Sequence, residues 1–157
     1  MIREFKLTNE KGQEFSLMDI EKYCLLTEPS GLGYSYSTEY EQLGNNFLTN
    51  LRKLEQGIIT GIANFLYYDN FMDFGNFIES AKKLQFVYSV PCKNEKKVFY
   101  RDVNIKSLDK SEKQTNGVIS EIIEFECLSL WYEQNETIFK IETYEDEMRY
   151  NYRWNSR

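Results

Sequence analysis

The sequence predicts a soluble, mainly β domain with one α-helix. Aromatic residues make up 16% of the 157-residue chain, mostly tyrosine (12) and phenylalanine (11), and proline is scarce at 2. Such large side chains favour pleated surfaces and interfaces. Most segments alternate apolar and polar residues with a period of two, whereas residues 71–81 switch to helical spacing. The length indicates one domain with a substantial core.

Short alternating segments in the N-terminal half predict strands. Four are expected, at residues 2–8, 13–17, 20–28 and 34–40. The first two form a hairpin around the turn at Asn9–Gly12. Residues 29–33 are predicted as a loop, because Pro29 fixes φ and two glycines permit positive φ. Residues 41–55 fit either a short strand or an irregular loop.

A helix is predicted after a strand at residues 56–67, in which Gly57 and Gly61 indicate a bend or bulge. Asp69 or Asn70 is the expected N-cap. One apolar face of the helix follows from 3–4 residue spacing. It comprises Phe71, Phe74, Phe77, Ile78 and Ala81. Gly75 costs about 1 kcal/mol relative to alanine inside a helix, which indicates a close approach by another group.

Three further strands are predicted at residues 84–90, 97–106 and 118–130, and residues 107–117 are predicted as an exposed turn or an extended hairpin tip. One face of the last strand is apolar and continues to Trp131. That face holds Ile119, Ile123, Phe125, Cys127 and Trp131. Ser120, Glu124 and Glu126 share the other face. Trp131 is therefore expected to anchor the core.

Catalysis finds little support in the residue types, and we predict no enzyme, cofactor or metal site. The chain has no histidine, which removes the usual general base and most zinc sites. Cys24, Cys92 and Cys127 are far apart, so a disulfide framework is not expected, and Cys127 is expected to be a buried apolar side chain. Glu124 and Glu126 lie roughly 6–7 Å apart along a strand, a spacing that glycoside hydrolysis permits but that any solvated strand face also shows.

The charge of the chain argues against binding to polyanions. The formal net charge is −6 and the sequence pI is about 4.9, whereas nucleic-acid or anionic membrane surfaces require a basic face. The start of the chain has no apolar segment typical of a signal peptide. No apolar run approaches the ~18 residues of a membrane helix. We therefore expect a soluble protein of cytoplasmic synthesis.

Tyrosines at 34, 36 and 40 alternate with small polar residues, so they are expected to be partly exposed. Tyrosine is enriched where proteins meet, which favours a role in assembly. A small carbohydrate-binding module with exposed tyrosines is the alternative.

A series of features along the chain resembles the N-terminal domain of the distal tail protein (Dit) of siphophages infecting Gram-positive bacteria. In order, they are the turn at Asn9–Gly12, the loop Gly31-Leu32-Gly33, the strand from Gly57, the helix with Tyr68 and Phe71, the segments Leu84–Tyr88 and Tyr100–Val103, Lys110 with Glu112, and Trp131-Tyr132. Each feature consists of common residues, and the order and spacing of the set carry the resemblance.

The resemblance implies a β-sandwich or barrel-like fold with one flanking helix. It also implies a hexameric ring at the virion tail tip that joins the tail tube protein to the baseplate, a tail-associated lysin or fibre, and receptor-binding proteins. The loop Gly31, Leu32 and Gly33, and the turn with Lys110 and Glu112, are expected to contact other subunits.

The resemblance also predicts a domain boundary. Residues 1–132 are expected to form the ring-forming domain, which closes at Trp131-Tyr132. Residues 133–148 hold six acidic residues against one lysine and have neither glycine nor proline. Because family members commonly carry a second, galectin-like domain, residues 133–157 are expected to be a linker and the start of an incomplete second domain, as in a shortened chain or a prophage remnant.

Overall fold

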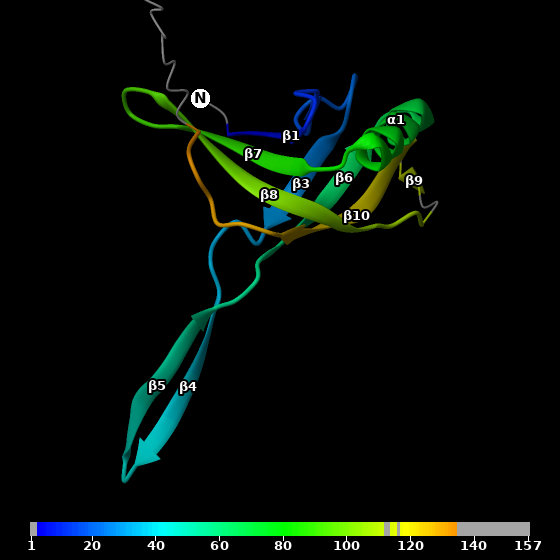
Figure 1. Ribbon diagram of the computed structural model, residues 1–157. Helices are drawn as coiled ribbons and strands as arrows, with labels where there is room; N and C mark the ends of the chain where they lie inside the picture. The colour runs from blue at the N-terminus through cyan, green and yellow to red at the C-terminus, as the bar shows by residue number, and fades with distance from the viewer. Residues whose placement is uncertain (1–2, 112–113, 116, 135–157) are drawn as a thin grey trace, which may run out of the picture.

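The computed structural model describes residues 3–111, 114–115 and 117–134, in which ten strands and one helix form a body and a projecting arm (Figure 1). In chain order the elements are β1 (Glu4–Asn9), β2 (Glu14–Ser16), β3 (Leu25–Ser30), β4 (Tyr36–Leu43), β5 (Asn46–Leu54), β6 (Ile58–Phe65), α1 (Tyr68–Ser80), β7 (Leu84–Pro91), β8 (Lys96–Leu108), β9 (Gln114–Thr115) and β10 (Val118–Cys127).

The body is an antiparallel sheet that closes on itself as a barrel. Its strand order is β2-β1-β7-β8-β10-β6-β3, with β9 paired to β10. Leu17, just after β2, joins the two ends of this order. Its amide donates to the Phe5 carbonyl (3.0 Å), and its carbonyl accepts from the Leu26 amide (2.8 Å). A bridge between Met18 and Leu25 completes the closure. The predicted barrel-like β fold with one helix is confirmed.

The barrel interior is filled by aromatic and branched side chains from alternate strand positions. Phe86 is fully buried and lies between Phe5 (ring centroids 5.8 Å) and Phe125 (5.6 Å). The predicted apolar face of β10 is confirmed, because Ile119, Ile123, Phe125 and Cys127 are all buried. Trp131 packs against this core beside Phe86, as its position predicts.

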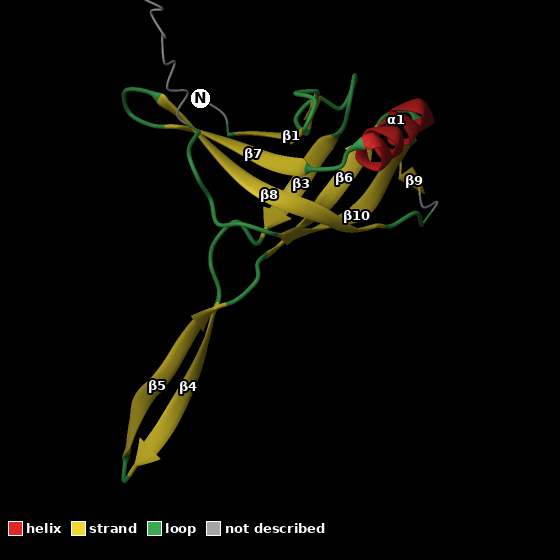
Figure 2. Cartoon of the chain, viewed as in Figure 1, coloured by secondary structure: helices red, strands yellow, loops and turns green. Residues whose placement is uncertain are grey.

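Helix α1 packs against the core through the predicted face (Figure 2). Phe74 is fully buried between Phe15 of β2 (4.9 Å) and Phe65 of β6 (5.5 Å). The flanking residues Phe71 and Phe77 contact the same two rings. The helix therefore joins the N-terminal hairpin to the end of β6.

Two details of the predicted helix are wrong. The N-cap is Tyr67, and no side chain caps the helix. Asp69 lies in the first turn, and the side-chain Nδ2 of Asn70 donates to the Glu21 carbonyl (3.2 Å) instead. Nothing lies within 4 Å of a Cβ built on Gly75, so no group approaches it closely.

Several strand boundaries differ from the prediction for local reasons. β3 begins at Leu25, because residues 19–23 form a turn in which the Tyr23 amide donates to the Asp19 carbonyl. It continues through Pro29 because the register shift between Thr27 and Ser30 leaves the positions between them unpaired. The bulge predicted near Gly61 thus lies in the partner strand of β6.

The last strand is shorter than predicted, whereas the segment before it contains strand pairing, as the predicted extended hairpin tip would. β10 ends at Cys127 instead of residue 130, because the Ser129 hydroxyl accepts from the Asp102 amide and interrupts the strand pairing. Pairing resumes at the bridge between Tyr100 and Tyr132. Within the predicted turn 107–117, β8 extends to Leu108 and β9 pairs with β10.

The region with two alternative predictions forms a strand. Residues 46–54 pair with residues 36–43, so that β4 and β5 make a separate two-stranded sheet. We call this hairpin the arm. It projects away from the barrel in Figures 1 and 2.

The barrel should depend strongly on Phe74. Phe74→Ala removes a fully buried ring at the junction of helix and sheet, and it should lower the free energy of unfolding by about 3–5 kcal/mol. Denaturant titration of both variants checks this, with Met72→Ala as the control, because Met72 lies on the same helix and is 46% exposed. Equal losses for both variants would contradict the assigned packing of the helix.

Candidate assembly surfaces

The arm is the most exposed part of the described chain. Every residue of β4 and β5 is exposed except Thr38, which is half-buried. Large apolar side chains are among them, and Phe47 (67%) and Tyr40 (63%) are the most exposed. A two-stranded hairpin on its own is only marginally stable in water. The arm therefore combines weak intrinsic stability with apolar surface, as expected of a segment that another molecule covers.

Both faces of the arm carry apolar side chains. Paired residues share a face, and the register has one shift, between Glu39 and Tyr40. One face holds Tyr36, Tyr40, Phe47 and Leu54, and the other holds Leu43, Leu48 and Leu51 with Glu39 and Glu41. Neither face is turned toward a core, so a partner can contact the arm from either side.

The two strands of the arm are also held together at the root of the hairpin. The Glu55 amide donates to the Ser35 carbonyl (2.9 Å), which continues the hairpin by one more bond. The Arg52 guanidinium lies 4.0 Å from the centroid of the Tyr36 ring. Such a cation–π contact at an exposed site adds about 0.5–1 kcal/mol.

The predicted contact loop Gly31-Leu32-Gly33 is held by its own domain. Gly31 has φ +77°, and a Cβ at this position would lie 1.8 Å from the Ile58 carbonyl oxygen. The Leu32 carbonyl accepts a hydrogen bond from Trp131 Nε1 (2.8 Å). Gly33 is exposed. The loop thus joins the start of β6 to Trp131 and leads directly into the arm.

The other predicted contact residues lie elsewhere. Lys110 Nζ donates to the Tyr68 hydroxyl (3.1 Å) and sits 5.2 Å from the ring centroid, at the start of α1. Glu112 lies outside the described residues. Because Ile58 and Tyr68 lie at opposite ends of β6 and its extension, the structure does not bring Lys110 and the Gly31–Gly33 loop together.

One buried carboxylate, that of Glu121, was not predicted from the sequence. Glu121 is 1% exposed, and its two carboxylate oxygens accept from the Ser111 amide (2.9 and 3.0 Å). The Ser111 N–H is shared between the two oxygens, and the Ser111 hydroxyl adds a longer contact (3.4 Å), so these charge-assisted donors offset part of the desolvation of the carboxylate. The sequence held a signal for this burial, because Glu121 lies two residues from both Ile119 and Ile123 and so shares their strand face. The carboxylate holds Ser111, just after β8, against β10.

The aromatic pair Trp131-Tyr132 has two roles. Trp131 packs inward, whereas Tyr132 donates from its hydroxyl to Asp102 Oδ1 (2.9 Å) and accepts from Gln85 Nε2 (2.6 Å). Burial, followed by the neighbouring Asp102 carboxylate, raises the pKa of Tyr132. The pair therefore anchors the chain on both faces of the sheet.

The residues considered for chemistry are engaged in the structure. Glu124 forms an ion pair with Lys106 (3.0 Å), which neutralises one of the two carboxylates that a glycosidase would use. Cys24 and Cys127 are buried, and burial raises the pKa of both thiols, that of Cys24 to about 12. In the described part of the chain, no three potential ligands are grouped to hold a metal ion.

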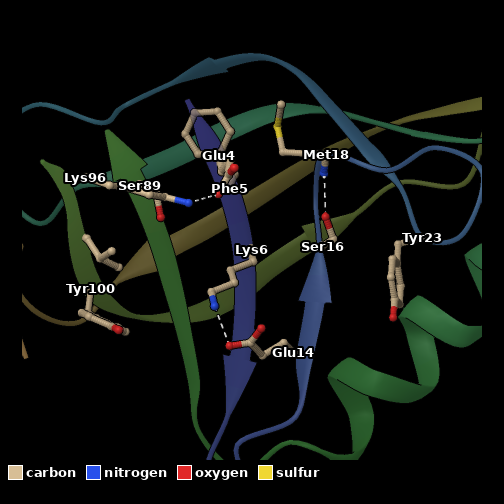
Figure 3. A pocket seen from close by; sticks show the side chains of 11 residues that line it. Glu4, Phe5, Lys6, Glu14, Ser16, Met18, Tyr23, Ser89, Lys96 and Tyr100 are labelled. Atoms are coloured by element: carbon tan, nitrogen blue, oxygen red, sulfur yellow. Dashed lines mark hydrogen bonds and ion pairs between the residues drawn. The ribbon is translucent and has the colours of Figure 1, made fainter. Parts of the chain in front are cut away.

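A groove crosses the outer face of the barrel over β1, β2, β7 and β8 (Figure 3). Lys6 pairs with Glu14 (2.5 Å), and Glu4 pairs with Lys96. Exposed pairs of this kind contribute little to stability. Since both carboxylates are already matched by lysines, the groove has the character of a solvated face.

A closed barrel that presents an apolar arm defines a structural assembly domain. Residues 4–128 match the family described as distal tail protein, N-terminal domain. The chain belongs to this family of structural phage tail proteins, and the resemblance read from the sequence is confirmed. In the described residues, no helix is both long and apolar enough to cross a membrane.

Solved structures share the fold. A chain of the phage p2 baseplate in its activated conformation is 21% identical with a TM-score of 0.68, over 83% of this chain and 46% of that chain. The SPP1 Dit protein, described as a hub of the adsorption apparatus in phages infecting Gram-positive bacteria, is 13% identical with a TM-score of 0.57, over 83% and 52%. A chain of the sheath–tube complex of an extracellular contractile injection system is 14% identical with a TM-score of 0.51, over 83% of this chain and 87% of that chain.

The chain spans about half the length of the p2 and SPP1 chains. None of the curated proteins matches it.

Gly31 and Gly33 should differ sharply in their tolerance of alanine. Gly31→Ala combines a positive φ with a backbone clash and should cost more than about 2 kcal/mol of unfolding free energy. Gly33→Ala meets open space and should change stability by less than about 1 kcal/mol. Denaturant titration of the two variants decides. A neutral Gly31→Ala would show that the loop is not packed on Ile58.

The three thiols should react unequally. Cys92 is half-buried, whereas Cys24 and Cys127 are buried and their raised pKa values disfavour the reactive thiolate. At pH 8 the folded chain should be alkylated rapidly at Cys92 alone, and unfolding should expose the other two. Mass spectrometry of peptides after timed iodoacetamide treatment measures this. Rapid labelling of Cys127 in the folded chain would contradict its burial.

Proposed function

We propose that this chain forms the ring of a phage tail tip. Six copies would surround a channel and join the tail tube protein to the baseplate, the tail-associated lysin or fibre, and the receptor-binding proteins. Membership of the distal tail protein family supports the tail-tip role. The observation that carries self-association is the exposed arm, whose apolar faces have no partner within the described part of the chain.

A closed ring requires two different surfaces on each subunit. The arm supplies one, because it projects from the barrel and offers apolar side chains on both faces. The barrel of the next copy supplies the other. A heterologous contact of this kind repeats around an axis until the ring closes, which accounts for an arm that does not fold back on its own barrel.

The predicted contact residues fit this arrangement to different degrees. The loop Gly31–Gly33 runs into the arm, so an arm that docks on a neighbour would bring Gly33 close to that neighbour. Lys110 lies at the start of α1, at the other end of β6, and would serve a second contact. The acidic chain also suits a channel that DNA passes without binding, since like charges repel.

Exposed tyrosines favour carbohydrate binding as a second candidate function. Tyr34 (53%), Tyr36 (49%) and Tyr40 (63%) are all accessible. Arg52 covers Tyr36, which leaves Tyr34 and Tyr40 as the rings available for stacking on a sugar. Substitutions in and beside the arm separate carbohydrate binding from ring assembly.

Tyr40→Ser with Phe47→Ser should abolish ring formation while the barrel remains folded. These two side chains share one arm face and are the most exposed of its apolar groups. Loss of two interface anchors should weaken self-association at least about 100-fold. Light scattering over a concentration series, with negative-stain imaging, measures the oligomer. Tyr67→Ser, which alters an equally exposed tyrosine outside the arm, is the control.

Two results would count against the proposal. A wild-type chain that stays monomeric at every concentration would contradict the ring. A double variant that assembles like wild type would contradict the assignment of the arm as the contact between subunits. Binding of cell-wall glycan that is lost with Tyr34→Ser and Tyr40→Ser, without any effect on assembly, would favour the carbohydrate-binding module instead.

A further inference from the structure

A buried arginine lacks part of its hydrogen bonding. Arg101 on β8 is 2% exposed, and its Nε donates to the Ser129 carbonyl (2.9 Å). Its Nη1 is buried without an acceptor, and none of the ion pairs in the described residues includes this guanidinium. A buried cation without a counter-ion is costly to the fold. The buried Glu121 differs in this respect, because both of its oxygens accept from Ser111, whereas Arg101 Nη1 has no acceptor.

The surroundings hold the guanidinium in place but do not neutralise it. Its carbon lies 5.5 Å from the centroid of the Trp131 ring. On another side a Cβ at Gly57 would lie 2.6 Å from Nη2, so the glycine makes room for the arginine. The backbone and an aromatic ring thus fix the fork of donors, while the charge stays unmatched.

Arg101 lines a hollow at the root of the arm, which we call the arm-root hollow. It measures about 490 Å³ and is lined by Leu54, Glu55, Gln56, Arg101, Cys127, Leu128, Ser129 and Leu130. Leu54 (41%), Leu128 (56%) and Leu130 (50%) leave apolar surface exposed around it. The hollow therefore has exposed leucines and the exposed Glu55 at its rim, and a buried cation without an ion pair inside it.

A carboxylate flanked by apolar side chains is the ligand that this chemistry selects. A guanidinium binds a carboxylate through charge-assisted hydrogen bonds, and Nη1 is the donor of Arg101 that still lacks an acceptor. The leucine face of the arm offers such a combination. Glu39 pairs across the ribbon with Leu51, and Glu41 pairs with Leu48. In the described chain neither carboxylate takes part in an ion pair.

These carboxylates cannot reach the hollow of their own chain. At the root of the arm, Leu54 of β5 pairs with Tyr36 of β4. Glu39 lies three residues beyond Tyr36 on β4, toward the tip of the arm. At about 3.3 Å per residue, Glu39 is roughly 10 Å from the root and Glu41 is further away. Because the arm extends away from the barrel, an acidic side chain of the arm meets this hollow only on another copy.

We propose that the arm-root hollow receives the carboxylate of Glu39 or Glu41 from the arm of a second copy. Arg101 is then the buried cation that fixes the register of each arm on its neighbour. This inference rests on the proposed ring, since it specifies the heterologous contact that closes it. The pairing is directional, so every copy gives one arm and receives another.

The test compares two neutralising double variants in the full chain. Glu39→Gln with Glu41→Gln removes the carboxylates of the arm, and Glu21→Gln with Glu79→Gln makes the same charge change at exposed sites elsewhere. The arm variant should raise the concentration at half-assembly at least about tenfold. The control should assemble like wild type. Sedimentation velocity over a concentration series gives both values.

A mixing experiment then tests that the contact lies between copies. Arg101→Met keeps an acidic arm and loses the cation, whereas the arm variant keeps the cation. At a concentration at which wild type is half assembled, neither variant should form rings alone, but a mixture should give dimers, because the acidic arm of one variant still meets the Arg101 of the other. Circular dichroism verifies that both variants are folded, and the arm variant, altered only at exposed positions, decides the question if Arg101→Met does not fold.

The two proposals fail in distinguishable ways. Wild-type chain that never associates overturns the ring and this contact together. Wild-type rings with an arm variant that assembles equally well overturn the Arg101 contact alone and leave the ring standing. Folded variants that give no dimers on mixing also overturn it.

Discussion

Closure of the barrel through Leu17 is the constraint on which the rest of the structure depends. Its amide and carbonyl join β1 to β3, so the strands of the described barrel leave no long edge open to another chain. Phe74 packs the helix onto this core, so the apolar core of the barrel is closed by its own contacts. Exposed apolar surface remains on the arm.

The charged groups inside the barrel show the same separation between stability and function. Glu121 is buried but matched by the Ser111 amide, so it serves the fold. Arg101 is buried and only partly matched, and it lies where the arm leaves the barrel. A cation that the subunit leaves unsatisfied weakens the isolated chain and strengthens a contact that supplies an anion. In this account the ring completes the hydrogen bonding that folding leaves unfinished.

Sequence patterns predicted the elements whose one face is buried. The helix face around Phe74 and the apolar face of β10 followed from their periods, because a core selects side chains at regular intervals. The arm gave no such signal, because both of its faces are exposed. No core therefore selects apolar residues at alternate positions in residues 41–55. The partners of Arg101 and the packing of Gly31 on Ile58 arise from tertiary contacts, which spacing cannot encode. For the same reason the assignment of Gly31–Gly33, and of Lys110 with Glu112, to contacts with other subunits stays a prediction.

The most direct test of this account is an electron cryomicroscopy reconstruction of the assembled full chain. We expect a closed ring in which each arm lies across the arm-root hollow of the next subunit, with density joining Arg101 to a carboxylate of that arm. A ring built from contacts between barrels, with every arm free in solvent, would contradict the central claim that the arm makes the assembly.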